Sequence, residues 1–152
     1  MVRKAKISDV PLIHKIINEF AQRGDLLPRP LSELYDHLRD YNVIESPHEN
    51  NSIVGVCGLG ICWDDLAEIK SLAVVPTHQG KGYGRSLVEV SLKEAREFGI
   101  PKVFTLTYIP RFFQKLGFKE IDKSKLPQKI WADCLKCPHF PDCKEVALIT
   151  YL

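Results

Sequence analysis

The sequence predicts a protein of the α/β (α+β) class, in which strands and amphipathic helices alternate along 152 residues. The main observation is a strand-like run at residues 67–76 that leads through a glycine-rich turn into a long amphipathic helix ending before Gly99. Helical periodicity also marks two segments near the N-terminus, and short apolar runs with strand character lie on both sides of the central helix. The length gives room for a single domain, residues 1–152, with a sizeable core.

The N-terminal part of the chain is predicted to hold one short strand and two helices. Residues 2–6 have strand character, and a helix is expected from about residue 8 to residue 23, with Gly24 as its stop. Pro28 and Pro30 exclude a helix between them, and a second helix begins at Leu31. The apolar positions that define the two helices are Val10, Ile13, Ile17 and Phe20, and then Leu31, Leu34, Tyr35 and Leu38.

Further strands and one short helix complete the predicted order. Tyr41–Ser46 and residues 52–62 are expected to pair as a hairpin around a polar turn. After the central helix come a strand at Lys102–Thr107, a short helix that begins after Pro110, and a strand at residues 117–121. A polar excursion that contains prolines covers about residues 122–144, and residues 146–152 form the last strand.

The glycine-rich turn before the central helix is predicted to bind an anion. Glycine allows φ above zero and lets the backbone approach a ligand closely. A helix that begins behind such a turn directs unpaired N–H groups and the positive end of its dipole at the ligand, which is most naturally a phosphate. The alternative is a loop that only reverses the chain. The residues of the turn are Gln79, Gly80, Lys81, Gly82, Tyr83, Gly84 and Arg85.

The spacing within this turn distinguishes between the known phosphate-binding motifs. A P-loop needs Ser or Thr after its lysine, but Gly82 follows Lys81. A dinucleotide fingerprint needs G-x-G-x-x-G at the first helix of a βαβ unit, and this turn lies in the middle of the chain. The turn instead resembles the acyl-CoA signature of the GNAT acetyltransferase superfamily, (Q/R)-x-x-G-x-(G/A), at Gln79, Gly82 and Gly84.

The resemblance to the GNAT superfamily extends along nearly the whole chain. The predicted element order, β-αα-ββ-β-α-β-α-β-β, is similar to that of the superfamily, and so is an aromatic–x–K–x–G–F segment within residues 111–118. The resemblance implies a mixed, mostly antiparallel central sheet with helices on both faces. It also implies acetyl-CoA as the cosubstrate, with the pyrophosphate on the amides of the turn and the pantetheine arm along the strand backbone around Leu72 and Val74.

Two charged residues of the central strand are candidates for the chemistry. Glu68 and Lys70 lie two apart, so both side chains are expected on one face of the sheet, which Leu72 and Val74 continue and which borders the acetyl group. Glu68 falls where the histone-acetylating branch of the superfamily carries its general base, and a carboxylate can take the ammonium proton directly or through a water. The alternative is a solvated Glu68–Lys70 pair on an exposed strand.

The proton donor for the departing CoA thiolate is less clearly marked. Phe113 stands where many superfamily members place a tyrosine for this role, and phenylalanine cannot donate a proton. Tyr108, at the exit of the preceding strand, is the candidate that can serve instead. The alternative is an unassisted thiolate that takes its proton from water, since a free thiol has a pKa of about 8.5.

Three segments, at residues 26–35, 103–108 and 126–134, resemble the acetyltransferase domain of N-acetylglutamate synthases of the short bacterial kind. The resemblance implies acetylation of L-glutamate to N-acetylglutamate, in arginine biosynthesis. A substrate with two carboxylates needs at least two fixed cations, and Arg29 between two prolines and Lys70 on the acceptor face are the candidates. The alternatives are an acetyltransferase of peptide or protein N-termini or another small amine, and a non-catalytic acetyl-CoA sensor.

Three cysteines and a histidine gather within the excursion, at Cys134, Cys137, His139 and Cys143. C-x-x-C is half of many zinc sites, and this set has enough ligands for a four-coordinate metal. The spacing is not that of a standard zinc finger, so reduced thiols that stabilise a turn and a reversible disulfide remain alternatives. Cys57 and Cys62 lie in an apolar strand region and are expected to be buried thiols.

The composition sets the remaining expectations. Lys and Arg number 21 and Asp and Glu number 19, so the net charge of +2 indicates no nucleic acid or other polyanion as a partner. No apolar run approaches the ~20 residues of a membrane span, and the N-terminus lacks the core of a signal peptide. We expect a cytoplasmic protein that binds a small amino acid and no membrane, with a homodimer as a candidate assembly.

Overall fold

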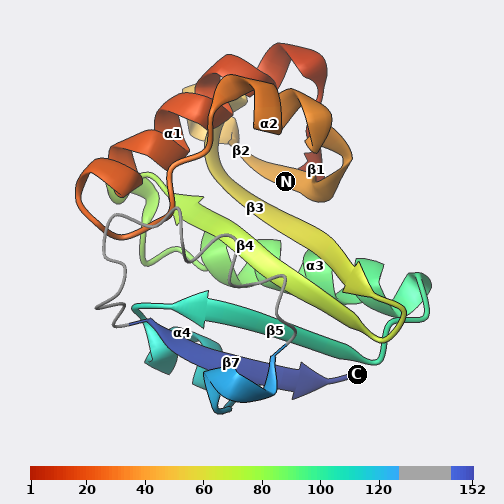
Figure 1. Cartoon of the computed structure of the whole chain (residues 1–152). Helices are drawn as coiled ribbons and strands as arrows, with labels where there is room; N and C mark the ends of the chain where they lie inside the picture. The colour runs from red at the N-terminus through yellow and green to blue at the C-terminus, as the bar shows by residue number, and fades with distance from the viewer. Residues whose placement is uncertain (127–144) are drawn as a thin grey trace.

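A seven-stranded sheet with the strand order β1-β2-β3-β4-β5-β7-β6 forms the centre of the computed structural model, which describes residues 1–126 and 145–152 (Figure 1). Neighbouring strands run antiparallel except for β4 and β5, which are parallel. The predicted mixed, mostly antiparallel sheet is therefore confirmed. The strands are β1 (Val2–Lys4), β2 (Tyr41–Ser46), β3 (Ser52–Trp63), β4 (Leu66–Val74), β5 (Lys102–Thr107), β6 (Lys119–Glu120) and β7 (Val146–Tyr151).

Helices cover both faces of this sheet, as the α/β class predicts (Figure 1). α1 (Val10–Gln22) and α2 (Leu31–Asp36) lie on one face, and α3 (Tyr83–Glu97) and α4 (Pro110–Gln114) lie on the other. No helix in the described part of the chain is both long enough and apolar enough to cross a membrane. Short 3-10 turns are found at Ile7–Asp9, Leu38–Asp40, Pro47–Glu49, Pro76–His78 and Lys123–Lys125.

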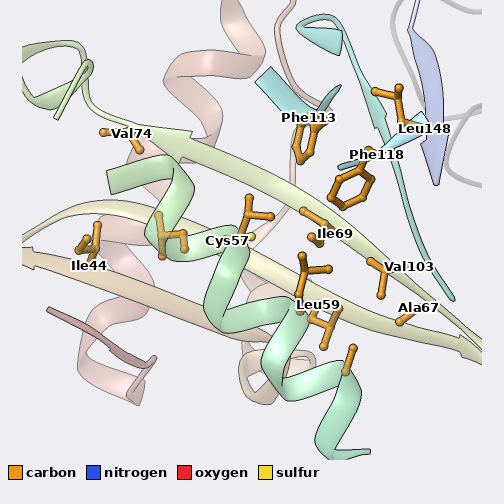
Figure 2. Packing of buried hydrophobic residues seen from close by; sticks show 14 of the residues in the cluster. Ile44, Cys57, Leu59, Ala67, Ile69, Val74, Val103, Phe113, Phe118 and Leu148 are labelled. Atoms are coloured by element: carbon orange, nitrogen blue, oxygen red, sulfur yellow. The ribbon is translucent and has the colours of Figure 1, made fainter. Parts of the chain in front are cut away.

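Each face of the sheet buries its own apolar cluster. Under α3, the side chains of Leu87, Val88 and Leu92 pack on the strands because they recur at helical spacing along one face of the helix. Figure 2 shows this cluster, with strand residues such as Ile69 meeting α3. Burial of each such side chain stabilises the fold by roughly 1.5–3 kcal/mol. The cluster under α1 and α2 consists of Val10, Ile13, Ile16, Ile17, Leu34, Tyr41, Val43, Ile53, Val56 and Ala73.

Strand β4 carries a bulge at Ser71 that changes the direction of the side chains after it. Its pairing with β3 passes from Lys70 opposite Gly58 to Ala73 opposite Val56, so two residues of β4 face one residue of β3. Ser71 has a φ of 55°, which lies in the left-handed region that residues with a Cβ seldom adopt. Because side chains alternate along a strand, one extra residue exchanges the two faces for everything that follows.

The bulge corrects one expectation from the sequence. Simple alternation puts Leu72 and Val74 on the face of Glu68 and Lys70, and this is wrong. Val74 is buried in the cluster under α3, and Leu72 packs against the same cluster (Figure 2). Glu68 and Lys70 do share a face, and it is the one covered by α1 and α2, since the Lys70 ammonium lies over the ring of Tyr41.

Two elements are shorter than the sequence predicts. The strand expected at residues 117–121 pairs only at Lys119–Glu120, because Gly117 has a φ of 95° and the N–H of Phe118 still donates to the carbonyl of Phe113. Helix α2 ends at Asp36 and is followed by a 3-10 turn rather than by a further helical turn. Most of the predicted excursion, residues 127–144, lies outside the described residues.

Candidate functional site

A pocket of about 620 Å³ lies where β4 and β5 separate. Their pairing ends at Ile69 opposite Thr105, whose hydroxyl donates to the Ile69 carbonyl at 2.9 Å, and β4 then runs on to Val74 (Figure 1). Among the predicted site residues in the described ranges, Lys81 alone does not line this pocket. Those that do are Arg29, Glu68, Lys70, Leu72, Val74, Gln79, Gly80, Gly82, Tyr83, Gly84, Arg85 and Tyr108.

One part of the pocket, here called the turn end, is formed by the turn at residues 79–85, all of which except Lys81 line the pocket, and its surface is mainly backbone. Gly80 and Gly82 have φ values of 79° and 81°, and no atom lies within 4 Å of the place a Cβ would take at either. Gly82 caps α3, so the first N–H groups of the helix have no acceptor within it. A Cβ on Gly84 would come 3.2 Å from Phe112, which shows how closely α3 approaches α4. The turn end therefore has the open backbone and the helix N-terminus that suit an anion.

Side chains of the turn fix its position and leave its cations accessible. The Gln79 amide Nε2 donates to the carbonyl of Val74 at 2.9 Å, which ties the turn to the end of β4. Lys81 is exposed, and the exposed Arg85 contacts Glu89 one helical turn further on, with Nε 2.8 Å from Oε1. An exposed pair of this kind contributes little, about 0.3–0.5 kcal/mol, so Arg85 can exchange Glu89 for a phosphate at small cost.

The backbone of β4 beside the turn end forms a strand edge. In the described chain β5 pairs with β4 only as far as Ile69, and the bulge leaves Ser71 and Leu72 without a register partner on β3. Both residues line the pocket. An open strand edge can accept an extended ligand as an additional strand through main-chain hydrogen bonds. The expectation that the backbone around Leu72 contacts an extended arm is compatible with this geometry.

A second part of the pocket, lined by Arg29, Glu68 and Lys70, is here called the cation end. The Lys70 ammonium lies 3.1 Å from Oδ2 of Asp40 and 5.8 Å from the centre of the Tyr41 ring. Burial alone would lower the pKa of Lys70, but the neighbouring Tyr41 and Asp40 outweigh it and raise that pKa, so Lys70 is charged at neutral pH.

The Lys70 side chain lies across two glycines of β3. A Cβ on Gly58 would come 3.0 Å from Lys70 Cγ, and one on Gly60 would come 3.2 Å from Lys70 Nζ. These two positions pair with Lys70 and Glu68 and therefore share their face of the sheet. The absence of side chains on β3 thus provides the space in which the ammonium lies.

Arg29 is buried in the connection between α1 and α2. Only 5% of the residue is exposed, and its Nη1 lies 2.8 Å from Oε1 of Glu33. Its carbonyl accepts a hydrogen bond from Asn18 of α1, whose Nδ2 also donates to the carbonyl of His14. Helix α1 therefore holds the connection to α2, and the pocket receives a buried and a partly buried cation, Arg29 and Lys70, each paired with a carboxylate.

Glu68 and Tyr108 line the same pocket from different strands. Glu68 lies opposite Gly60 on β3 and Phe104 on β5, in the last stretch of β4 that is paired on both sides. Tyr108 follows directly after β5. Phe113, which has no proton to donate, also lines the pocket, so Tyr108 remains the proton donor that the sequence predicts.

Comparison with known proteins decides the family. A family model described as the acetyltransferase (GNAT) family matches residues 13–118, which include most of α1, the whole of β4 and the glycine turn. The chain belongs to the GNAT acetyltransferase family. The match includes every predicted catalytic, cofactor-binding and substrate-binding position.

Relatives of this GNAT acetyltransferase cover most of its length. An uncharacterized N-acetyltransferase of Chlorobaculum tepidum is 38% identical over 151 residues, which are 99% of this chain and 96% of that protein. An amino-acid acetyltransferase of Mycobacterium tuberculosis is 34% identical over 86% of this chain and 75% of its own length. An amino-acid acetyltransferase of Pasteurella multocida is 30% identical over 84% of this chain, which spans 29% of that longer protein.

Solved structures match the whole acetyltransferase chain. A Mycobacterium tuberculosis protein in complex with CoA and NLQ superposes with a TM-score of 0.85 and 30% identity, covering 100% of this chain and 99% of that one. N-acetylglutamate synthase from Neisseria gonorrhoeae, complexed with coenzyme A and N-acetyl-glutamate, gives a TM-score of 0.88 and 27% identity over 100% of this chain and 35% of that one. The predicted GNAT fold is confirmed.

Sequence reasoning missed His78, which lines the pocket of this acetyltransferase directly before the glycine turn. The residue is 4% exposed, its Nδ1 lies 2.9 Å from the hydroxyl of Thr77, and its Nε2 lies 3.4 Å from Oε1 of Glu49. Its ring stacks on Tyr83, with centroids 6.0 Å apart. His78 therefore links the turn between β2 and β3 to the start of α3. Its position directly before Gln79 is the only sequence feature that could have indicated that His78 lines the pocket.

A metal site within the described ranges is not found. Residues 1–126 and 145–152 contain no group of three His, Cys, Asp or Glu side chains that could hold a metal. The predicted set Cys134, Cys137 and Cys143 lies outside the described residues. Cys57 and Cys62 are buried, as predicted, and burial raises the pKa of Cys57 to about 12, so that it stays protonated and unreactive.

Proposed function

We propose that this acetyltransferase transfers the acetyl group of acetyl-CoA to the α-amino group of an amino acid, with L-glutamate as the acceptor. The product, N-acetylglutamate, would enter arginine biosynthesis. One observation carries the proposal: a single pocket joins an open backbone turn at its turn end to two cations, the buried Arg29 and the partly buried Lys70, at its cation end. The relatives named amino-acid acetyltransferase, and the related structure that holds coenzyme A and N-acetyl-glutamate, support it.

In this proposal acetyl-CoA lies along β4. Its pyrophosphate binds the amides at Gly82 and the start of α3, where the helix dipole favours negative charge. Its pantetheine arm follows the open edge of β4 at Leu72 and Val74. Arg85 and Lys81 supply positive charge at the solvent side of the phosphates. The related structures that contain CoA support this choice of cosubstrate.

The acceptor carboxylates bind at the cation end. Arg29 offers a planar fork that can bind a carboxylate through two parallel hydrogen bonds, and Lys70 offers a point charge with three donors. The two cations lie close enough that Arg29 acts on the pKa of Lys70. An acceptor with two carboxylates can therefore engage both, whereas a monocarboxylic amino acid leaves one of them unused.

Glu68 is the proposed general base, and it lies on the face of β4 that Lys70 shares. It removes a proton from the acceptor ammonium, directly or through a water, and the amine then attacks the thioester carbonyl. The new C–N bond forms, the nitrogen loses its second proton to solvent, the C–S bond breaks, and CoA leaves as a thiolate. That thiolate takes a proton from Tyr108 or from water, and at neutral pH either route costs little because a free thiol has a pKa of about 8.5.

The proposal is tested by measuring CoA release from acetyl-CoA with each of the twenty amino acids and with a short peptide as acceptor. We expect L-glutamate to give the highest kcat/KM, with glutamine next among the longer side chains. A preference for a neutral or cationic amino acid, or for the peptide, would overturn the assignment of the acceptor. Tight CoA binding with no turnover on any acceptor would favour a sensor instead.

A further inference from the structure

Asp40 holds the Lys70 ammonium from outside the pocket. Lys70 lines the pocket and Asp40 does not, so the carboxylate approaches the ammonium from the side away from the pocket. The side chains of Lys70 and Asp40 are 12% and 26% exposed, and the atoms Nζ and Oδ2 are 3.1 Å apart. The same oxygen of Asp40 lies 3.6 Å from Nδ1 of His37, which is mostly exposed. The ion pair is thus part of the wall of the cation end.

The position of the ammonium leaves it little freedom. Gly58 and Gly60 form the floor under the Lys70 side chain, and the Tyr41 ring lies 5.8 Å from the ammonium on another side. A substrate carboxylate that reaches Lys70 must therefore approach from the pocket while Asp40 keeps its place. An ammonium has three donors, so it can bind both carboxylates at once.

We propose that Asp40 is a specificity-determining residue, which limits how strongly the pocket prefers an acidic acceptor over the neutral amide of the same shape. Two carboxylates on one ammonium repel each other, and this repulsion cancels part of the attraction that Lys70 exerts on the acceptor. A neutral amide, as in glutamine, does not experience that repulsion. The proposal rests on the proposed function in one respect only, that the acceptor side chain contacts Lys70.

The test compares kcat/KM for glutamate and for glutamine in the wild type and in Asp40→Asn, which keeps the shape of the side chain and removes its charge. The glutamate-to-glutamine ratio should rise on the order of tenfold, a change of about 1.4 kcal/mol, through a lower KM for glutamate. The KM for acetyl-CoA should not change, which also shows that the variant is folded. Asp36→Asn, which alters an exposed acid of α2, is the matched control and should leave the ratio unchanged. An unchanged or lower ratio in Asp40→Asn overturns the proposal.

A second background tests whether the effect passes through Lys70. The glutamate-to-glutamine ratio of the double variant Lys70→Met/Asp40→Asn should equal that of Lys70→Met alone. If Asp40→Asn raises the ratio equally with and without Lys70, the proposal is overturned. Gly60→Val, which fills the space 3.2 Å from the ammonium, should lower the ratio. Where an amino acid is not turned over, its inhibition constant against the best acceptor supplies the same ratio.

The outcomes separate this inference from the proposed function. A wild type that prefers an acceptor other than glutamate overturns the proposed function, while the change of the ratio in Asp40→Asn can still be measured. A wild type that prefers glutamate, combined with an unchanged ratio in Asp40→Asn, overturns this inference alone.

Discussion

The turn end and the cation end of the pocket are built in opposite ways. The turn end comes from the consecutive residues 79–85 and presents mainly backbone, with open space around Gly80 and Gly82. The cation end brings Arg29 and Lys70 together from distant parts of the sequence, buries the first and partly buries the second, and places each beside a carboxylate, Glu33 or Asp40. One end therefore depends on local backbone conformation, and the other depends on tertiary packing and on the balance of buried charges.

This difference predicts how the two ends respond to substitution. At the turn end, a change matters when it alters φ or fills the space above the amides, and the identity of the exposed side chains matters little. At the cation end, a change of a single charge leaves a buried partner uncompensated, which is costly. The predictions below test this contrast.

The largest effect is expected for Arg29→Ala. Removal of a buried charge partner leaves a substrate carboxylate unpaired and costs roughly 2–5 kcal/mol, which at 1.4 kcal/mol per decade is some 30- to several-thousand-fold. Because Arg29 binds the substrate and the transition state alike, the loss should appear mainly as a higher KM for glutamate. Arg29→Lys should restore part of it, since a point charge cannot reproduce the guanidinium fork.

Steady-state kinetics and CoA calorimetry check this prediction. The CoA affinity of Arg29→Ala should equal that of the wild type, because the turn end does not depend on the cation end. Arg39→Ala, at an exposed arginine of the turn before β2, is the control and should behave as wild type. Equal KM values for glutamate in Arg29→Ala and Arg39→Ala would contradict the assignment.

The next largest effect is expected at the turn end, for Gly82→Val. A β-branched side chain disfavours the φ of 81° and fills the space above the helix amides. Loss of one or two hydrogen bonds to a charged phosphate, at roughly 1.5–3 kcal/mol each, should weaken CoA binding on the order of 10²-fold.

The chain provides a matched control for this change. Gly99, which follows α3, has the same φ of 81° and the same open surroundings, but it does not line the pocket. Gly99→Val should therefore lower the stability through backbone strain and leave the CoA affinity unchanged. Calorimetry on both variants separates strain from binding, and equal CoA affinities would show that the turn end does not hold the phosphates.

The third effect depends on pH. Glu68→Gln should lower kcat on the order of 10²-fold near neutral pH, within the usual range for a general base. The loss should shrink as the pH rises, because more of the acceptor is then already a free amine. The measurement is the ratio of the wild-type kcat to the variant kcat between about pH 6 and pH 9.5. A constant ratio across that range would assign Glu68 a structural role, whereas a general base in the pocket predicts a ratio that falls as the pH rises.

The fold and the turn end could be predicted from the sequence because their signals are local. The apolar positions of α3 recur at helical spacing, and Gly80 and Gly82 stand where the chain takes positive φ. Both the helix and the turn can therefore be recognised within one short segment. The acyl-CoA signature can be recognised for the same reason, since its residues are contiguous in the sequence.

The cation end could be predicted only in part, because its geometry arises from distant contacts. Nothing in the residue type of Ser71 requires a φ of 55°, and so the reversal that moves Val74 to the other face could not be foreseen. The pairing of Lys70 with Asp40 depends on how β4 packs beside the turn that precedes β2. The link between His78 and Glu49 likewise requires the completed sheet.

The glycine floor under Lys70 has a consequence for how such a pocket can diverge. A codon for glycine becomes one for alanine, valine, serine, arginine or an acidic residue through a single base change. At Gly60 each of these would place a Cβ 3.2 Å from the ammonium of Lys70, so that the ammonium would have to shift. The choice of acceptor can therefore shift in one mutational step, while the machinery that holds the cosubstrate stays intact at the other end of the pocket.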